Sequence, residues 1–229
     1  MFKNLVSSII ATKVVAHTTE EWKQRSVYQL LTDRFGRTDG NTQACSDLHN
    51  YCGGTFKGIE QNLDYISGMG FDAIWISPIP KNAPADYHGY GALDWEEVNE
   101  HFGTPDELHS LIKACHDRDI WVMLDVVANH SSYYGYNNGD FSAVYPLDKP
   151  EHYHLPKCDI DFSDQWSVEH CWLSGLPDLD QSNDYVRTYL KTWISTVVSE
   201  YEFDGIRIDT IPHIEKPFWS EYGEAAGVF

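Results

Sequence analysis

Short apolar, β-branched segments alternate with amphipathic segments along most of this chain, and this alternation restricts the fold more than any other feature. Strands are predicted at 25–31, 73–76, 120–127 and 205–209. Helices are predicted at 56–69, at about 105–118, at 184–201 and across the FWSEYGEAAG segment. Because parallel strands need a crossover between them, this spacing predicts right-handed βαβ units around a parallel sheet. We expect an α/β fold with about four strand–helix units.

The strand predicted at 120–127 and the helix before it have clear local signatures. The run IWVMLDVV is apolar almost throughout, which is typical of a strand covered on both faces. Thr104 precedes a proline and two acidic residues, a sequence that favours a helix N-terminus. Long connections at about 78–100 and 130–180 follow strand ends, where parallel α/β enzymes place their active sites. The second is long enough to form a small subdomain.

The chain is strongly acidic, since 35 Asp and Glu residues against 16 Lys and Arg residues give a net charge of −19. Such a charge repels the phosphates of nucleic acids and the headgroups of anionic lipids. No apolar run approaches the roughly 18–20 residues that a membrane-spanning helix needs. We therefore expect no nucleic-acid partner and no membrane partner.

The N-terminal segment indicates export from the cell. Residues 1–16 (MFKNLVSSIIATKVVA) fit a signal peptide that is cleaved after Ala16. Lys13 interrupts its apolar part, so a structural leader strand is the alternative. We expect the mature protein to be secreted.

The cysteines agree with an extracellular location. Cys45 and Cys52 form one close pair, and Cys158 and Cys171 form another, both in polar segments. Two short disulfide-closed loops are predicted, each contributing about 2.5–3 kcal/mol. Cys115 falls within a helical pattern and is expected to be a buried free thiol.

Two acidic residues in the predicted strands point to chemistry. Because side chains alternate along a strand, Arg207 and Asp209 share one face, where the guanidinium would pair with an ionised carboxylate. A carboxylate at the C-terminal end of a strand is well placed to act as a nucleophile. Asp125 lies inside an apolar strand and needs a partner, for which Arg207 is the obvious candidate. Taken alone, the Arg207–Asp209 pair could equally be a structural ion pair.

Further polar residues gather in the long connections. His88 and Tyr90, in the YHGY segment, could offer a stacking face and hydrogen bonds to a sugar. Asn129 and His130 leave the strand at 120–127 together. The acids of LPDLD, near Glu169, provide oxygen ligands that favour a hard cation such as calcium. Each of these motifs is weak by itself, and their order along the chain carries the interpretation.

In that order the motifs resemble the α-amylase family of retaining glycoside hydrolases, and most of all its secreted fungal members. The similarity covers about residues 22–229, through WKQRSVYQLLTDRFGRTDG, YCGGTFKGI, LDYISGMGFDAIWISP, YHGY, DVVANH, VEHCWL, LPDLD and DGIRIDT. The resemblance implies the first four to five β/α units of a (β/α)8 barrel, with a small subdomain inserted after strand 3. Residues 17–129 and 181–229 would form the barrel part, and 130–180 the inserted calcium-binding subdomain.

The resemblance also implies a role for each candidate site residue. Asp209 would be the nucleophile, and Arg207 would position it. The implied sugar contacts are Tyr90, His88, His130 and His213, with Asp125 as an interior partner of Arg207. A structural Ca²⁺ would bind the side chains of Asn129, Glu169 and Asp178 and the main-chain oxygen of His213.

The sequence departs from the family at several positions. Retaining hydrolysis needs a nucleophile and a proton donor about 5–5.5 Å apart, and the family's donor Glu follows the fifth strand, beyond this sequence. We therefore expect the 229-residue chain to be inactive on starch by itself. Pro212 replaces a Lys, Gly91 replaces a Trp, and Lys57 replaces a Gln, so leaving-side and stacking contacts differ.

The resemblance implies endo-hydrolysis of α-1,4-glucosidic bonds in starch or glycogen as the function. The alternatives are a non-catalytic, calcium-stabilised glucan-binding relic and a sibling transglycosylase or α-glucosidase. The expected partner is an α-glucan polysaccharide, and a full-length protein is expected to be a monomer.

Overall fold

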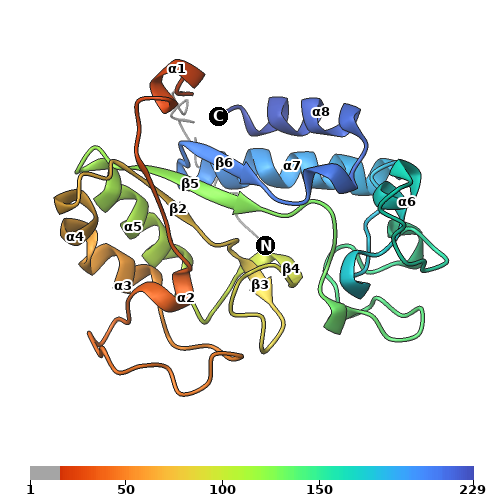
Figure 1. Cartoon of the computed structure of the whole chain (residues 1–229), viewed down its shortest axis with the longest axis horizontal. Helices are drawn as coiled ribbons and strands as arrows, with labels where there is room; N and C mark the ends of the chain where they lie inside the picture. The colour runs from red at the N-terminus through yellow and green to blue at the C-terminus, as the bar shows by residue number, and fades with distance from the viewer. Residues whose placement is uncertain (1–15) are drawn as a thin grey trace, which may run out of the picture.

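The computed structural model describes residues 16–229, so the predicted leader at 1–16 lies outside the described residues except for Ala16. Four strands form one parallel sheet in the order β1-β2-β5-β6 (Figure 1). Their bounds are Val27–Gln29 for β1, Ala73–Ile76 for β2, Trp121–Val126 for β5 and Gly205–Ile208 for β6. The four predicted strands and their parallel arrangement are therefore confirmed.

Helices cover one face of this sheet. They are α3 (Phe56–Gln61), α4 (Leu63–Gly68), α5 (Pro105–His116), α7 (Asp184–Tyr201) and α8 (Lys216–Ala226). Figure 1 shows α3, α4 and α5 at one end of the sheet, with α7 and α8 alongside β6. Alternate strand residues such as Ile74, Leu124 and Ile206 pack with these helices in one core. The opposite strand residues are left for the other face, which carries the candidate site.

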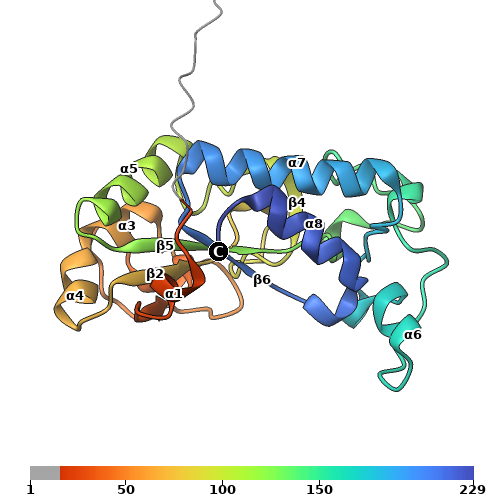
Figure 2. The same ribbon diagram turned by 90° about the horizontal axis from the view of Figure 1, so that it is seen from above.

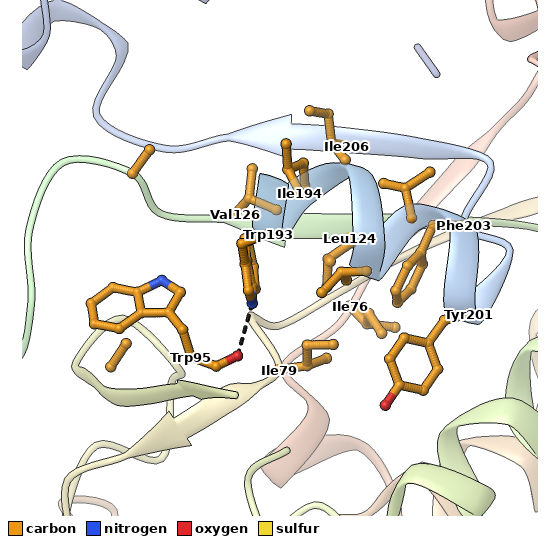
Figure 3. Packing of buried hydrophobic residues seen from close by; sticks show 14 of the residues in the cluster. Ile76, Ile79, Trp95, Leu124, Val126, Trp193, Ile194, Tyr201, Phe203 and Ile206 are labelled. Carbon is orange, nitrogen blue, oxygen red and sulfur yellow. Dashed lines mark hydrogen bonds between the residues drawn. The ribbon is translucent and has the colours of Figure 1, made fainter. Parts of the chain in front are cut away.

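The core between α7 and the sheet is dense and aromatic (Figure 3). Trp193 of α7 is nearly buried, and its indole Nε1 donates a hydrogen bond to the carbonyl of Trp95, 2.8 Å away. Phe203 and Leu124 are fully buried beside it. Burial of such side chains contributes roughly 1.5–3 kcal/mol each, which fixes the helix against the strands that hold the site.

The helix predicted at 56–69 is in fact two helices, because the backbone leaves helical geometry at Asn62 (φ −114°, ψ 15°). The Asn62 side chain donates to the carbonyl of Gly58 at 2.8 Å. An amide side chain that bonds the local backbone competes with helical hydrogen bonding. The helical spacing of apolar residues continues from α3 into α4, so the sequence pattern could not reveal the break.

The connection at 78–100 contains a hairpin that the sequence did not predict. Strands β3 (Pro80–Asn82) and β4 (Ala92–Val98) pair antiparallel, with register shifts on either side of Lys81. Short strands with a proline and irregular pairing lack a clear alternation, which explains the omission.

The segment between β5 and α7 is mostly irregular. It contains α6 (Gln165–His170) and three 3₁₀ helices, η1 (Tyr133–Gly135), η2 (Pro150–His152) and η3 (Leu173–Gly175). The remaining elements outside it are α1 (Thr19–Trp22), α2 (Thr32–Phe35) and η4 (Ile211–His213). The C-terminal Phe229 lies beside α1, where its ring stacks on Trp22 at 5.3 Å (Figure 2). No helix in residues 16–229 is long and apolar enough to span a membrane.

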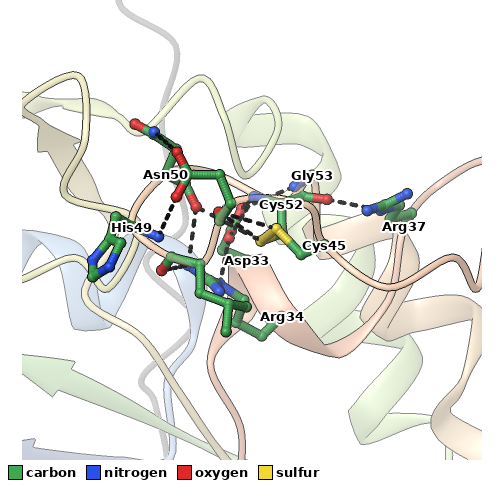
Figure 4. The surroundings of a disulfide bond; sticks show 10 residues. Asp33, Arg34, Arg37, Cys45, His49, Asn50, Cys52 and Gly53 are labelled. Atoms are coloured by element: carbon green, nitrogen blue, oxygen red, sulfur yellow. Dashed lines mark hydrogen bonds and ion pairs between the residues drawn. A yellow bond between two sulfur atoms is a disulfide. The ribbon is translucent and has the colours of Figure 1, made fainter.

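Both predicted disulfides are present, Cys45–Cys52 and Cys158–Cys171, and Cys115 is a buried free thiol as predicted. Figure 4 shows the first disulfide beside Asp33, whose buried carboxylate accepts from the backbone N–H groups of Cys52 and Gly53.

Candidate active site

Three charged side chains meet at the C-terminal ends of β5 and β6. Parallel pairing sets Asp125 directly opposite Arg207. The guanidinium Nη1 of Arg207 lies 3.1 Å from Asp125 Oδ1 and 2.7 Å from Asp209 Oδ1. Arg207 and Asp209 therefore share one strand face and Arg207 pairs with Asp125, as the sequence indicated.

Asp125 is the buried member of this group, with 1% of its surface exposed. Its Oδ2 also accepts hydrogen bonds from Trp75 Nε1 at 2.9 Å and from the Tyr90 hydroxyl at 2.7 Å. Burial raises the pKa of Asp125, although all three donors favour the charged form. A buried carboxylate with three donors is a rigid anchor for the groups around it.

Trp75 was missed by the sequence reasoning. Its indole donates to Asp125, and the Arg207 guanidinium lies over the same ring at 4.9 Å from the centroid. The position of Trp75 in β2 could have revealed it. Trp75 alternates with the core residues Ile74 and Ile76, so its side chain lies on the face of the sheet that carries the site. It helps to hold the guanidinium toward the carboxylates.

Asp209 is the accessible acid of the group, with 21% of its side chain exposed. It follows β6 directly, and its backbone N–H donates to the carbonyl of Val126 at 3.0 Å. Thr210, the next residue, adopts a left-handed conformation (φ 53°) that turns the chain away from the sheet. The Arg207 guanidinium contacts Asp209 through Oδ1.

The YHGY segment brings His88 and Tyr90 beside these carboxylates. Their rings are 5.6 Å apart and close to parallel. The backbone N–H of Tyr90 donates to His88 Nδ1 at 3.0 Å, which leaves Nε2 of the neutral ring as a donor. Burial lowers the pKa of His88 and raises the pKa of Tyr90.

His130 lies behind Tyr90 and is only 2% exposed. Its Nε2 is 3.2 Å from the carbonyl of Tyr90, and its Nδ1 is 3.2 Å from the side-chain amide of Asn129. Burial lowers the pKa of His130 to about 4, so the ring is neutral. Both ring nitrogens of His130 therefore have partners within the protein.

Two of the four predicted cation ligands come together beyond β5. The backbone N–H of Leu179 donates to the carbonyl of Asn129 at 2.8 Å, so the 129 and 178 regions run side by side. The buried Oδ1 atoms of Asn129 and Asp178 have no hydrogen-bond partner. Burial raises the pKa of Asp178 to about 6. Two orphaned buried oxygens, one from a carboxyl group, suit a hard cation.

The other two predicted ligands lie where α6 meets η4. Glu169 Oε1 accepts from Gln165 Nε2 at 2.7 Å, and the same amide is 3.2 Å from the carbonyl of Pro212. His213 Nδ1 lies 3.0 Å from the carbonyl of Val168. In the described part of the chain no group of three or more His, Cys, Asp or Glu side chains could hold a metal ion. The predicted ligand set has only two carboxylates, and its other two ligands are an amide oxygen and a main-chain oxygen.

The structure shows the surroundings of two positions at which the sequence departs from the family pattern, Gly91 and Lys57. A Cβ on Gly91 would lie 1.7 Å from Asp86 Oδ2, so the Asp86 carboxylate occupies the space beside this glycine. Burial raises the pKa of Asp86. Lys57 pairs with Glu60 on α3, at 2.7 Å. Asp86 was not singled out from the sequence, and only its position in space reveals it.

The comparisons with known proteins give a consistent result. The family described as "Alpha amylase, catalytic domain" matches residues 29–224. Alpha-amylase 2 of Schizosaccharomyces pombe is 44% identical over 93% of this chain, which spans 39% of that protein. An alpha-amylase structure from Malbranchea cinnamomea is 42% identical and superposes with a TM-score of 0.87, over 93% of this chain and 48% of that one.

A bacterial structure is also similar. The alpha-amylase from Geobacillus thermoleovorans, complexed with acarbose, is 41% identical with a TM-score of 0.80, over 90% of this chain and 44% of that one. The chain thus spans less than half the length of each of these proteins.

Proposed function

Because the chain belongs to the α-amylase family, we propose that it carries the nucleophile and much of the glucan-binding surface of a retaining endo-hydrolase of α-1,4-glucosidic bonds in starch and glycogen. The arrangement of Asp209, Arg207 and Asp125 at the mouth of β5 and β6 carries this proposal. A reactive carboxylate at strand C-termini is where barrel enzymes hold their nucleophiles.

The residues divide the chemistry among them. Oδ2 of Asp209 would attack the anomeric carbon, the glycosidic bond would break, and the leaving oxygen would take a proton from a general acid outside this sequence. Water would then hydrolyse the glycosyl ester. Arg207 would hold Asp209 through Oδ1, so that the attack can come from Oδ2. Tyr90, His88 and His130 would bind the sugar ring, and the contact of His130 with the Tyr90 carbonyl would hold these groups together.

We propose Ca²⁺ as the cation of the neighbouring site. The side chains of Asn129, Glu169 and Asp178 and the main-chain oxygen of His213 would hold it, and the orphaned oxygens of Asn129 and Asp178 support this assignment. The ion would supply the positive charge that joins the 130–180 subdomain to the barrel parts at 17–129 and 181–229. His213 would also contact the leaving side of the glucan.

The same proposal includes secretion, an α-glucan partner and a monomeric full-length protein. The two disulfides support an extracellular location, because such bonds persist in oxidising compartments.

A glycosyl fluoride tests the proposal, because fluoride leaves without a proton and the general acid is not needed. With α-maltosyl fluoride, Asp209 would form the glycosyl ester while the C–F bond breaks. We expect the 229-residue chain to release fluoride, and a 5-fluoro analogue to label Asp209, as read by mass spectrometry. Starch should react about 10²–10⁴-fold more slowly than the fluoride, because its leaving oxygen needs a proton.

The matched controls are Asp209→Asn, which should abolish fluoride release, and Asp159→Asn, which changes an exposed acid and should not. Glucan binding by a folded chain without fluoride release would instead favour the non-catalytic alternative. Labelling at a residue other than Asp209 would refute the assignment of the nucleophile.

A further inference from the structure

The two carboxylate oxygens of Asp178 have different surroundings. Oδ2 lies 2.7 Å from Nδ1 of His154, whereas Oδ1 is buried without a hydrogen-bond partner. A carboxylate only accepts hydrogen bonds, so His154 must donate from Nδ1. One oxygen is therefore occupied by the imidazole, and the other is kept free.

The imidazole that makes this contact is itself held in place. His154 Nε2 lies 3.3 Å from Asp180 Oδ1, so carboxylates flank both ring nitrogens. Its backbone N–H donates to the carbonyl of Asp178 at 3.0 Å, and its carbonyl accepts from Trp172 Nε1 at 2.9 Å. With 15% of its side chain exposed, the ring has little freedom to turn away from Asp178.

Asp178 sits between two partners on neighbouring extended segments. The segment at 177–179 bonds to 129–131 on one side and to 153–154 on the other. Asn129 approaches from the first side with its orphaned Oδ1, and His154 approaches from the second with its donor. The free oxygen of Asp178 and the free oxygen of Asn129 belong to the same buried region.

We propose that His154 is a positioning residue of the cation site: its Nδ1–H binds Oδ2 of Asp178 and orients Oδ1 toward the ion. This inference rests on the calcium site proposed above. Groups that hold a metal ligand in place typically alter metal affinity about 10–100-fold when they are removed.

Calcium titration of the whole chain by isothermal titration calorimetry tests this role. We expect His154→Leu, which removes the donor, to raise the dissociation constant for Ca²⁺ about 10–100-fold. We expect His154→Asn to stay within a few-fold of the parent chain, because its amide nitrogen takes the place of Nδ1. If the Leu variant does not fold, as judged by circular dichroism in EDTA, His154→Gln replaces it, because its amide lies near the Nε2 position.

His152→Leu is the matched control. His152 is also buried and lies two residues away, but its ring stacks on Tyr185 and its Nδ1 accepts from the N–H of Lys149. This variant should lose folding stability without a specific loss of Ca²⁺ affinity. A structural role for His154 would make the two Leu variants alike.

Each result has a clear meaning. Equal Ca²⁺ binding by the parent chain and His154→Leu would overturn the positioning role and leave the cation site standing. Loss of affinity in His154→Asn equal to that in His154→Leu would show that the donor is not the cause, and would also overturn it. A parent chain that binds no Ca²⁺ would overturn both the proposed site and this inference.

Discussion

Asp125 shows how much of this site depends on single contacts. The sheet buries its carboxylate almost completely, and Arg207 supplies the compensating positive charge. Removing one member of a buried ion pair leaves the other uncompensated, which costs more than the pair contributes. The ion pair therefore affects the stability of the fold as well as the orientation of Asp209.

A double-mutant cycle measures this dependence. Arg207→Met should lower the free energy of unfolding by about 3 kcal/mol, at the lower end of the range for a broken buried pair because the guanidinium is 33% exposed. Asp125→Asn in the same chain should recover at least about 1 kcal/mol, since no buried charge then lacks a partner. Urea unfolding of the two single variants and the double variant gives the coupling, and additive losses would contradict the prediction.

At the scale of elements, a contact between a histidine and an aspartate joins α5 to the start of β6, away from the candidate site. His116 lies in the last turn of α5, and its Nε2 is 2.9 Å from Asp204 Oδ2, just before β6. Asp204 also accepts from the N–H of Val122 and lies 3.3 Å from His17 Nε2. The contact ties α5, strands β5 and β6 and the N-terminal segment together.

The stability of this contact should depend on pH. The hydrogen bond to Asp204 raises the pKa of His116 above its usual 6.5, so the folded protein holds the proton more tightly than the unfolded chain. Stabilisation is then complete below the unfolded pKa and is lost as the pH rises through the folded pKa. The difference in Tm between the parent chain and His116→Gln should be largest near pH ~5 and shrink toward pH ~9.

Asp204→Asn provides the control for this pH dependence. In that background the effect of His116→Gln should vary much less with pH, because the carboxylate that contributes most to the raised pKa of His116 is gone. A difference in Tm that grows with pH in the parent background would contradict the assignment.

At the scale of the whole molecule, two properties of the 229-residue chain oppose each other. The sheet has two edge strands, β1 and β6, in the described residues, and unpaired strand edges promote association. The net charge of −19 keeps copies of the chain apart. Salt screens the repulsion and leaves the backbone hydrogen bonds intact.

We therefore expect self-association of the isolated chain that increases with concentration and with salt, from low ionic strength to about 0.5 M. Sedimentation velocity measures it directly. A chain of constant mass across both ranges would show that the edges are protected.

The sequence alone determined the strands of the parallel sheet and most of the helices that cover it. The alternation of strands and helices, the two disulfides and the shared face of Arg207 and Asp209 all follow from spacing, because strand and helix periodicities and short loops are properties of neighbouring residues. Most of the fold and the central ion pair were therefore predictable.

Only the tertiary structure decided which distant residues meet. Trp75 and Tyr90 converge on Asp125, and His154 takes one oxygen of Asp178, because strand register and the packing of the long connections place them there. The break at Asn62 likewise depends on a side chain turning back to its own helix. A one-dimensional pattern specifies which way a side chain faces, but the partner it faces is set by the pairing of segments far apart in the chain.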